Sequence, residues 1–261
     1  MKNILKKILL LNKKEGETPL FALESFRKKN KEYEDVKMTY AGRLDPMASG
    51  LLLVLTGEET KNKEKYLALD KEYEFEVLFG FATDTYDILG KVVTPTNLPL
   101  NKGEARRGFA LKNLIKKNLK FFTGKFIQKY PIYSSKTVKG KQLFQYARGG
   151  EDVEIPEREV FVKGLKFLRL RKISNKKLLE NIEKRIKKVK GDFRQKEILK
   201  IWRKNLSVKH SMFDTGFYVA GFKVKCSSGT YVRAISNSLG EKMGIPALAF
   251  SIKRTKIGNW R

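Results

Sequence analysis

The chain has 261 residues, and its 56 Lys and Arg residues against 28 Asp and Glu residues give a formal net charge of +28 at pH 7. This excess is larger than solubility requires and favours a polyanionic partner. Nucleic acid ranks ahead of a membrane because no apolar run approaches the roughly 20 residues that span a bilayer. The single cysteine and single histidine exclude an intramolecular disulfide and a Cys/His zinc cluster. A general enrichment in Lys, Asn, Ile and Phe is the alternative explanation of the charge.

The first third of the chain predicts three strands and one helix. Residues 4–11 predict a buried strand; their longest unbroken apolar stretch, residues 8–11, is too short for a signal-peptide core, so we expect a cytoplasmic protein. A Thr-Pro pair opens a helical pattern over residues 18–29. Residues 51–55 are continuously apolar, which indicates an interior strand, and residues 73–79 alternate in the manner of a strand with one buried face.

A basic helical hairpin is predicted after a strand at residues 162–170. Two amphipathic helical patterns follow, with Lys and Arg on their outer faces, and Asp192 with Gln195 predicts a capping box at the start of the second. We place this hairpin at residues 173–206, as an insertion in a domain made of residues 1–172 and 207–261.

The C-terminal part returns to an alternation of strand and helix. Residues 218–224 predict a strand, a helix ends at Gly244, and a last short strand lies near residues 250–257. Strands mixed with dispersed helices, without tandem repeats, indicate an α+β fold.

The segment most informative about chemistry is the loop that precedes the apolar strand. Asp45 lies in this loop, and Pro46 restricts its backbone, so its carboxylate should point in one defined direction. A turn-forming Asp before Pro is the structural alternative.

Residues 42–52, GRLDPMASGLL, resemble the G-x-L-D-P-x-A-[ST]-G-x-L signature of the TruB-type tRNA pseudouridine synthases. Other segments of the chain resemble further motifs of that family in the same order. They are residues 9–16 (LLLNKKEG), 71–73 (KEY), 83–87 (TDTYD), 130–136 (YPIYSSK), 143–150 (LFQYARGG) and 226–233 (CSSGTYVR). The resemblance covers most of the chain apart from residues 170–211.

This resemblance implies a pseudouridine synthase core with a mixed, mainly antiparallel sheet flanked by helices, and an enzyme that needs no cofactor and no metal. Asp45 would be the catalytic carboxylate, which acts either by covalent attack or by removing a sugar proton. Arg233 would pair with Asp45 and keep it charged. Tyr73 would stack on the extruded uracil and help to remove the C5 proton, and Asp87 would meet the flipped nucleotide.

The expected substrate is tRNA, at position 55 of the T-arm, bound by a monomer. Basic and aromatic residues near the motifs would contact the RNA, and we expect these to be Lys13, Lys14, Tyr40, Arg43, Tyr133, Lys136 and Arg148 together with Asp87. The basic face of the hairpin would also bind RNA; the alternative is that this face is merely solvated.

Two departures from the family pattern stand out. Tyr40 occupies the position, five residues before the catalytic Asp, where the family usually has His. The chain also ends at Arg261, so we expect it to lack the C-terminal RNA-binding domain that many members carry.

Two other functions remain open from the sequence. One is a ribosomal RNA pseudouridine synthase, because the Arg-Leu-Asp and Ser-Gly-Leu-Leu elements of residues 43–52 also resemble those sister families. The other is a non-catalytic RNA-binding protein or tRNA folding chaperone.

Overall fold

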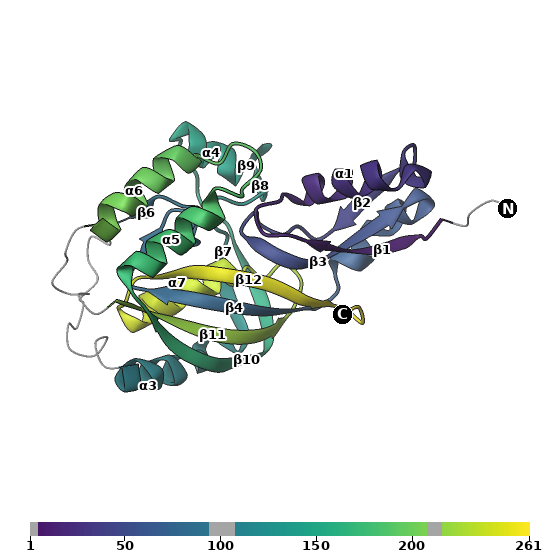
Figure 1. Ribbon diagram of the computed structural model, residues 1–261. Coiled ribbons are helices and arrows are strands. Elements are labelled where there is room, and N and C mark those ends of the chain that lie inside the picture. Colours follow the sequence, from purple (N-terminus) through teal and green to yellow (C-terminus); the bar gives the residue numbers. More distant parts are fainter. Residues whose placement is uncertain (1–4, 94–107, 208–215) are drawn as a thin grey trace.

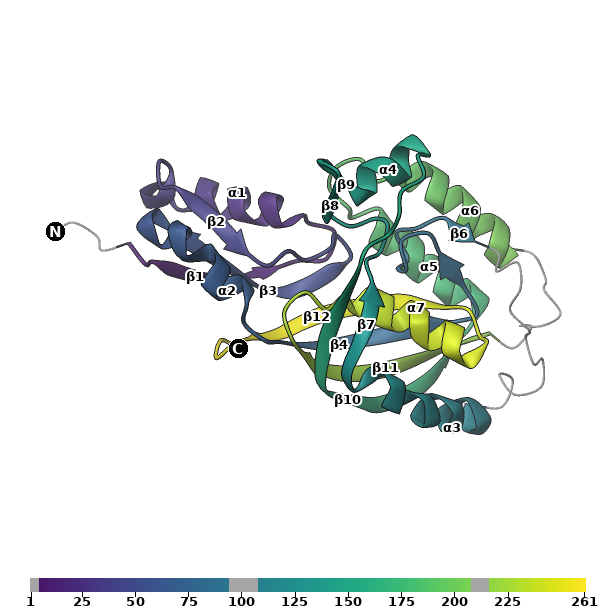
Figure 2. The same cartoon turned by 180° about the vertical axis from the view of Figure 1, so that it is seen from behind.

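A long curved sheet with helices on both faces forms the body of the molecule (Figures 1 and 2). This computed structural model describes residues 5–93, 108–207 and 216–261. The strands of the sheet are β1 (Ile8–Lys13), β2 (Met38–Ala41), β3 (Ala48–Thr56), β4 (Lys71–Phe79), β7 (Gly124–Lys129), β10 (Glu157–Ile173), β11 (Phe217–Cys226) and β12 (Ala247–Ile257).

The strand order is β1-β3-β12-β4-β11-β10-β7, with β2 paired to β3. Only β12 and β3 pair in parallel among these strands, and the other pairs are antiparallel. The prediction of a mixed, mainly antiparallel sheet in an α+β fold is therefore confirmed. Two minor two-stranded sheets join β5 (Ala82–Thr83) to β6 (Val92–Val93) and β8 (Thr137–Val138) to β9 (Lys141–Gln142).

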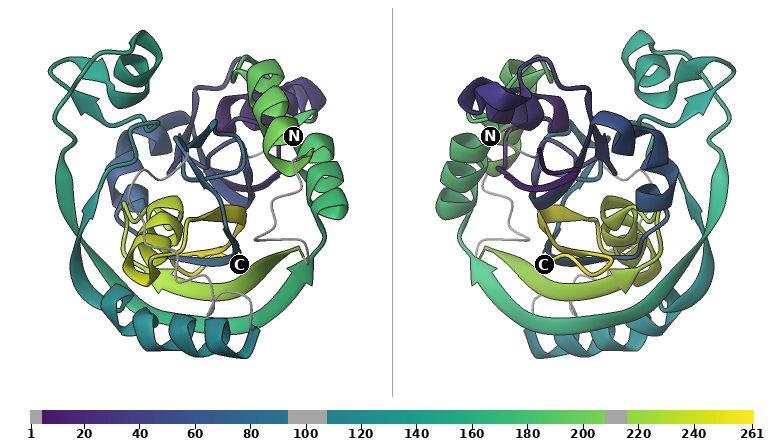
Figure 3. Two further views of the ribbon diagram at one scale, coloured as in Figure 1. Left: turned by 90° about the vertical axis from the view of Figure 1, so that its left-hand side faces the viewer. Right: turned by 90° about the vertical axis from the view of Figure 1, so that its right-hand side faces the viewer.

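Helices cover the sheet at several points. They are α1 (Pro19–Lys29), α2 (Lys63–Leu67), α3 (Gly108–Asn118), α4 (Leu143–Gly149), α5 (Asn175–Ile186), α6 (Gln195–Ser207) and α7 (Val232–Met243), with 3₁₀ turns at Lys31–Tyr33, Gly57–Asn62 and Leu119–Phe122. Figure 3 shows the long strand β10 bending round the molecule, with α4 and α5 continuing from its two ends.

The central strands are buried on both faces, which explains their apolar composition. On one face, Phe75 and Phe222 stack with their ring centroids 5.2 Å apart and pack with residues of α3 and α7. On the other face, Leu78 and Val219 pack with residues of α5 and α6, among them the fully buried Trp202. Burial of both faces is the arrangement expected for interior strands.

The helix and strand boundaries agree with some of the predictions and differ from others. The helix predicted at residues 18–29 is α1, and the Thr18 hydroxyl accepts a hydrogen bond from the amide of Phe21 at 3.1 Å. The first strand begins at Ile8, four residues later than predicted. It continues to Lys13, whose side chain is buried, which a hydrophobicity pattern does not reveal.

The predicted capping box between Asp192 and Gln195 is wrong. The Asp192 carboxylate accepts from the amide of Arg194, and the Gln195 side chain accepts from the amide of Phe193. Arg194 has a left-handed backbone with φ of 62°, so α6 begins only at Gln195. The two predicted helices are present as α5 and α6, whereas the division of the chain into a core domain and an inserted hairpin stays a proposal.

Candidate active site

The loop that carries Asp45 lies between β2 and β3 and is held by a buried arginine from β12. Arg254, 1% exposed, donates to the carbonyl oxygens of Leu51 at 2.7 Å, Gly42 at 3.1 Å and Arg43 at 3.3 Å. The Asp45 carbonyl accepts from the amide of Ala48 at 3.0 Å, which closes a turn after Pro46. These bonds fix the backbone from which the Asp45 side chain projects.

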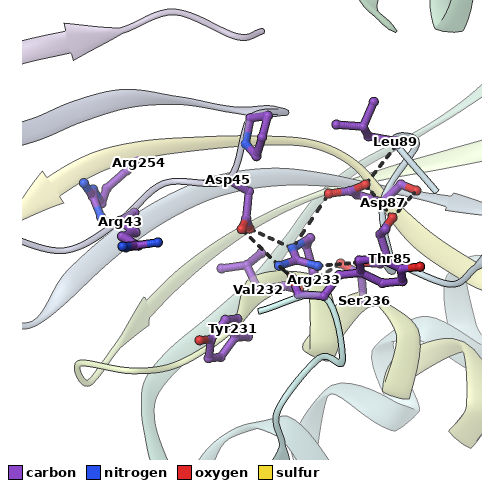
Figure 4. A network of polar contacts seen from close by, with 12 residues as sticks. Arg43, Asp45, Thr85, Asp87, Leu89, Tyr231, Val232, Arg233, Ser236 and Arg254 are labelled. Carbon is purple, nitrogen blue, oxygen red and sulfur yellow. Dashed lines mark hydrogen bonds and ion pairs between the residues drawn. The ribbon is translucent and has the colours of Figure 1, made fainter. Parts of the chain in front are cut away.

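Arg233, in the first turn of α7, binds the Asp45 carboxylate with two nitrogen atoms. Its Nε lies 2.7 Å from Oδ2 and its Nη2 lies 3.0 Å from Oδ1 (Figure 4). Such a two-point pair fixes both the position and the orientation of a carboxylate. The Arg233 side chain is 3% exposed and that of Asp45 is 35% exposed, so only the carboxylate is open to a substrate.

Asp87 is a second carboxylate on the buried side of Arg233. Its Oδ2 lies 3.7 Å from the Arg233 Nε, and its Oδ1 accepts from the amide of Leu89 at 2.9 Å and the hydroxyl of Thr85 at 2.8 Å. Arg233 also donates to the carbonyl oxygens of Thr85 and, at 3.3 Å, of Tyr133. The guanidinium is thus held from several sides, as Figure 4 shows.

The charges of this group follow from its burial. Burial lowers the pKa of Arg233, but the carboxylates of Asp45 and Asp87 outweigh it and raise the pKa, so the guanidinium stays charged. Burial raises the pKa of Asp87 to about 6, with Asp45 adding to the rise and Arg233 opposing it. Asp87 therefore titrates just below neutral pH.

This shift predicts how stability depends on pH. Because the pKa of Asp87 is about 6 when folded and 3.8 ordinarily, the folded state takes up the proton first as pH falls. The resulting stabilisation is fully present below the ordinary pKa and is lost as pH rises through the folded pKa. Between pH 7 and pH 5, the free energy of unfolding of the wild type should rise relative to Asp87→Asn by about 1 kcal/mol. Denaturant titrations of both proteins at each pH measure this difference, and parallel pH profiles would contradict it.

Tyr73 lies in β4, directly across from Arg254 of β12, and is buried in the core beside the site. Burial raises the pKa of Tyr73 to about 12; Arg254 opposes the shift and Asp45 adds to it. The phenol therefore stays protonated at neutral pH, and its expected help in removing the C5 proton stays a prediction. Its position remains suited to packing against a bound ring.

Two residues expected at the RNA surface lie inside the protein. Lys13 is fully buried, and its Nζ donates to the carbonyl oxygens of Glu17 at 2.6 Å, Lys14 at 3.0 Å and Pro46 at 3.5 Å. Burial lowers the pKa of Lys13 to about 8. This ammonium therefore binds the backbone of the Asp45 loop from inside the protein and does not reach the surface. Asp87 is buried behind Arg233 and faces its guanidinium, so its contact with a flipped nucleotide stays a prediction.

The other expected contacts are distributed as follows. Arg43, Lys14, Lys136 and Arg148 are exposed, and Arg43 Nη1 donates to the Ser135 hydroxyl at 2.6 Å. Tyr40 packs into an apolar cluster beside α1, with the Lys63 ammonium 5.9 Å from its ring centroid, so it does not join the Asp45 group. The ring of Tyr133 lies against the guanidinium of Arg194.

Sequence reasoning missed Arg254, Thr85 and Arg194 as residues that shape the site. Arg254 had one usable signal, since it stands two residues after the apolar Ile252 in a strand and so falls on the same face. Thr85 lies in the motif at residues 83–87, but it binds Arg233 through its carbonyl oxygen, which any residue has. The role of Arg194 depends on a tertiary contact and had no signal in the sequence.

The described part of the chain contains no candidate metal centre. Among residues 5–93, 108–207 and 216–261, no three His, Cys, Asp or Glu side chains are grouped so that they could hold a metal ion. In the same ranges, no helix combines the length and the apolar character needed to cross a membrane.

Residues 27–193 match the family model for TruB family pseudouridylate synthases, N-terminal domain. The chain belongs to this family. The tRNA pseudouridine synthase B of Caldanaerobacter subterraneus is 34% identical over 230 residues, which cover 88% of the chain and 62% of the relative. That of Caldicellulosiruptor saccharolyticus is 32% identical over 251 residues (96% and 67%), and that of Ligilactobacillus salivarius is 30% identical over 254 residues (97% and 68%). The chain thus spans about two thirds of the length of these TruB relatives or slightly less.

Solved structures share the fold of this TruB family member. A crystal structure of a Cbf5-Nop10-Gar1 complex superposes with a TM-score of 0.53 at 18% identity, covering 97% of the chain and 49% of the matched one. An H/ACA RNP structure bound to a substrate RNA containing 2'-deoxyuridine matches with a TM-score of 0.53 at 16% identity, covering 97% and 48%.

Proposed function

We propose that this protein isomerises uridine to pseudouridine in tRNA, at position 55 of the T-arm, as a cytoplasmic monomer that uses Asp45 as its catalytic carboxylate. The observation that carries the proposal is the partly exposed Asp45 carboxylate on a buried Arg233, within the family's sequence motif. Membership of the TruB family, and relatives named tRNA pseudouridine synthase B, support the reaction and the substrate.

The reaction replaces one bond between sugar and base by another. The bond from C1′ of the ribose to N1 of uracil breaks, the base rotates, and C5 joins C1′ while its proton is lost and N1 gains one. A carboxylate that is charged, oriented and open on one side suits either attack at C1′ or removal of a sugar proton. Tyr73, as a neutral phenol on the wall of the site, would pack against the uracil.

A uridine stacked in an RNA arm must leave its stack to reach Asp45. Unstacking costs a few kcal/mol, which contacts with the RNA backbone must offset. The proposed contacts are the exposed cations around the site, which are Lys14, Arg43, Lys136 and Arg148. Lysines at the C-terminal end of α5 and in the turn after it would extend this surface.

Deleting the hairpin is a poor test of that extension. Trp202, Ile182 and Ile198 pack into the core beneath the sheet, so the deletion would uncover apolar surface. Substituting exposed lysines avoids this problem. A variant with Gln at Lys184, Lys187, Lys188 and Lys190 should bind tRNA more weakly. The slope of the logarithm of the binding constant against the logarithm of the salt concentration should become less steep by about 0.7 to 0.9 for each phosphate that is no longer neutralised.

The matched control removes the same number of charges from the segment at α3, which lies away from the hairpin in Figure 1. It carries Gln at Lys112, Lys116, Lys117 and Lys120, all of them exposed. Filter binding at several salt concentrations compares the two variants. Equal slopes would mean that the hairpin lysines are merely solvated.

The proposed function is tested by incubating purified protein with unmodified transcripts of tRNA and of ribosomal RNA and then mapping pseudouridine in each. Pseudouridine in the T-arm of tRNA is the expected product. Pseudouridine in ribosomal RNA alone would favour a ribosomal RNA pseudouridine synthase. Binding to tRNA without any product would favour a folding chaperone.

A further inference from the structure

The α5–α6 pair is anchored directly beneath the segment that supplies Asp87. Trp202 of α6 is fully buried, its indole Nε1 donates to the carbonyl oxygen of Ile88 at 3.1 Å, and its ring meets Phe81 edge-on at 4.9 Å. Ile88 directly follows Asp87 in the chain. The two helices are therefore part of the wall behind the catalytic group.

The end of α5 reaches the Asp45 loop through the Glu15-Gly16 turn. Arg185 pairs with Glu15 through two nitrogen atoms, at 2.9 and 2.6 Å. The amide of Lys190 donates to the carbonyl of Gly16 at 2.7 Å, and the amide of Gly16 donates to the carbonyl of Pro46 at 2.8 Å. A hydrogen-bonded path thus runs from the hairpin turn to the residue after Asp45.

This junction is tightly packed at Gly16. Its φ is +90°, and a Cβ on it would lie 2.7 Å from the carbonyl oxygen of Lys188. A glycine is therefore required at this position for the turn to approach as closely as it does.

On the other side, Arg194 joins the turn to the segments that hold Arg233. Its Nη1 donates to the Asp84 carboxylate at 2.9 Å and to the Tyr133 hydroxyl at 2.7 Å, and its guanidinium lies 4.4 Å from the Tyr133 ring centroid. The Tyr133 carbonyl accepts from Arg233, and Asp84 precedes Thr85, whose carbonyl also accepts from Arg233. Arg194 is therefore linked to Arg233 along two routes, one through Tyr133 and the other through Asp84 and Thr85.

The turn contains a residue with an unfavourable backbone conformation. Arg194 has a left-handed backbone (φ 62°), which for a non-glycine residue costs about 1 kcal/mol or more. Arg148 of α4 donates to the carbonyl of Asp192 at 3.0 Å and fixes the turn from a third direction, where it passes beside β8 and β9 (Figure 1).

We propose that the turn at residues 187–194 is a brace of the active site, and that Arg194 is a positioning residue that sets the place of Arg233, and through it of Asp45, by holding Tyr133 and Asp84. The effect of this brace on turnover rests on the proposed function, whereas its effect on the local order of the site does not. A hairpin that only grips RNA would act on binding, and this brace acts on the chemical step.

The test compares Arg194→Met and Arg194→Lys with the control Arg203→Met, whose Arg203 pairs with Glu183 inside the hairpin. In Arg194→Met, kcat for pseudouridine formation should fall by about tenfold or more, while KM changes by less than about twofold. Arg194→Lys should recover part of kcat, because a lysine keeps a charge for Asp84 but not the planar contact with Tyr133. Arg203→Met should retain wild-type kcat.

Amide hydrogen exchange supplies a readout that needs no activity. The amides of Ala48 and Leu89, bonded to Asp45 and Asp87, should exchange faster in Arg194→Met and at the wild-type rate in Arg203→Met. Unchanged kcat and exchange in Arg194→Met would overturn the proposal, as would a rise in KM alone. If wild type forms no pseudouridine, the proposed function fails, and the exchange rates still decide whether the brace exists.

Discussion

Asp45→Asn is expected to abolish pseudouridine formation, with a loss of about 10⁴-fold or more, and to leave tRNA affinity within about threefold of wild type. The amide has nearly the size of the carboxylate, so the recess keeps its shape. The asparagine amide carries no charge, so this side chain can neither attack the sugar as an anion nor accept a sugar proton effectively. Because the Asp45 side chain is 35% exposed and Arg233 keeps Asp87 as a partner, the stability loss should stay near 1 kcal/mol. Single-turnover assays and tRNA binding measure the two effects separately.

The matched control for this variant is Asp70→Asn. The Asp70 side chain is 34% exposed and pairs with Lys163, so the substitution neutralises a carboxylate of similar exposure elsewhere on the protein. Its activity should equal that of wild type. Measurable turnover by Asp45→Asn, well above that of a protein-free reaction, would remove Asp45 from the catalytic role.

Arg233→Lys is expected to lower the single-turnover rate by about 100-fold while the protein stays folded. Lysine keeps the positive charge between Asp45 and Asp87. It cannot, however, donate at once to both Asp45 oxygens and to the carbonyl oxygens of Thr85 and Tyr133, as the guanidinium does. The carboxylate should then lose its fixed orientation. Assays with saturating enzyme isolate this step from RNA binding.

Arg171→Lys provides the comparison for that variant. Arg171 also approaches one carboxylate, that of Glu76, with two nitrogen atoms, at 3.4 and 3.1 Å. The substitution should disrupt a similar pair without any change in rate. A rate for Arg233→Lys within about threefold of wild type would show that charge alone, without the fixed two-point geometry, suffices.

The larger elements of the fold were predictable because their signals are local. The continuous apolar run at residues 51–55 gave the interior of β3, and the Thr18-Pro19 pair gave the start of α1. The pair of Arg233 with Asp45 followed from the family's motifs and not from spacing, since the two residues are 188 positions apart.

Other features of the site depend on tertiary contacts that no local pattern encodes. Lys13 reads as a surface cation and is buried because three carbonyl oxygens converge on its ammonium. Asp87 was expected to meet a flipped nucleotide, and its burial beside Arg233 was not foreseen. The start of α6 was misplaced because Arg194 is held in a left-handed conformation by distant residues, Asp84 and Tyr133 among them.

The most direct measurement is mass-spectrometric mapping, after selective chemical labelling of pseudouridine, of an unmodified tRNA transcript that was incubated with the purified wild-type protein without added cofactor. The account predicts that one uridine of the T-arm is converted to pseudouridine, at unchanged RNA mass. A folded protein that binds the transcript and leaves every uridine unconverted, in tRNA and in ribosomal RNA alike, would contradict it.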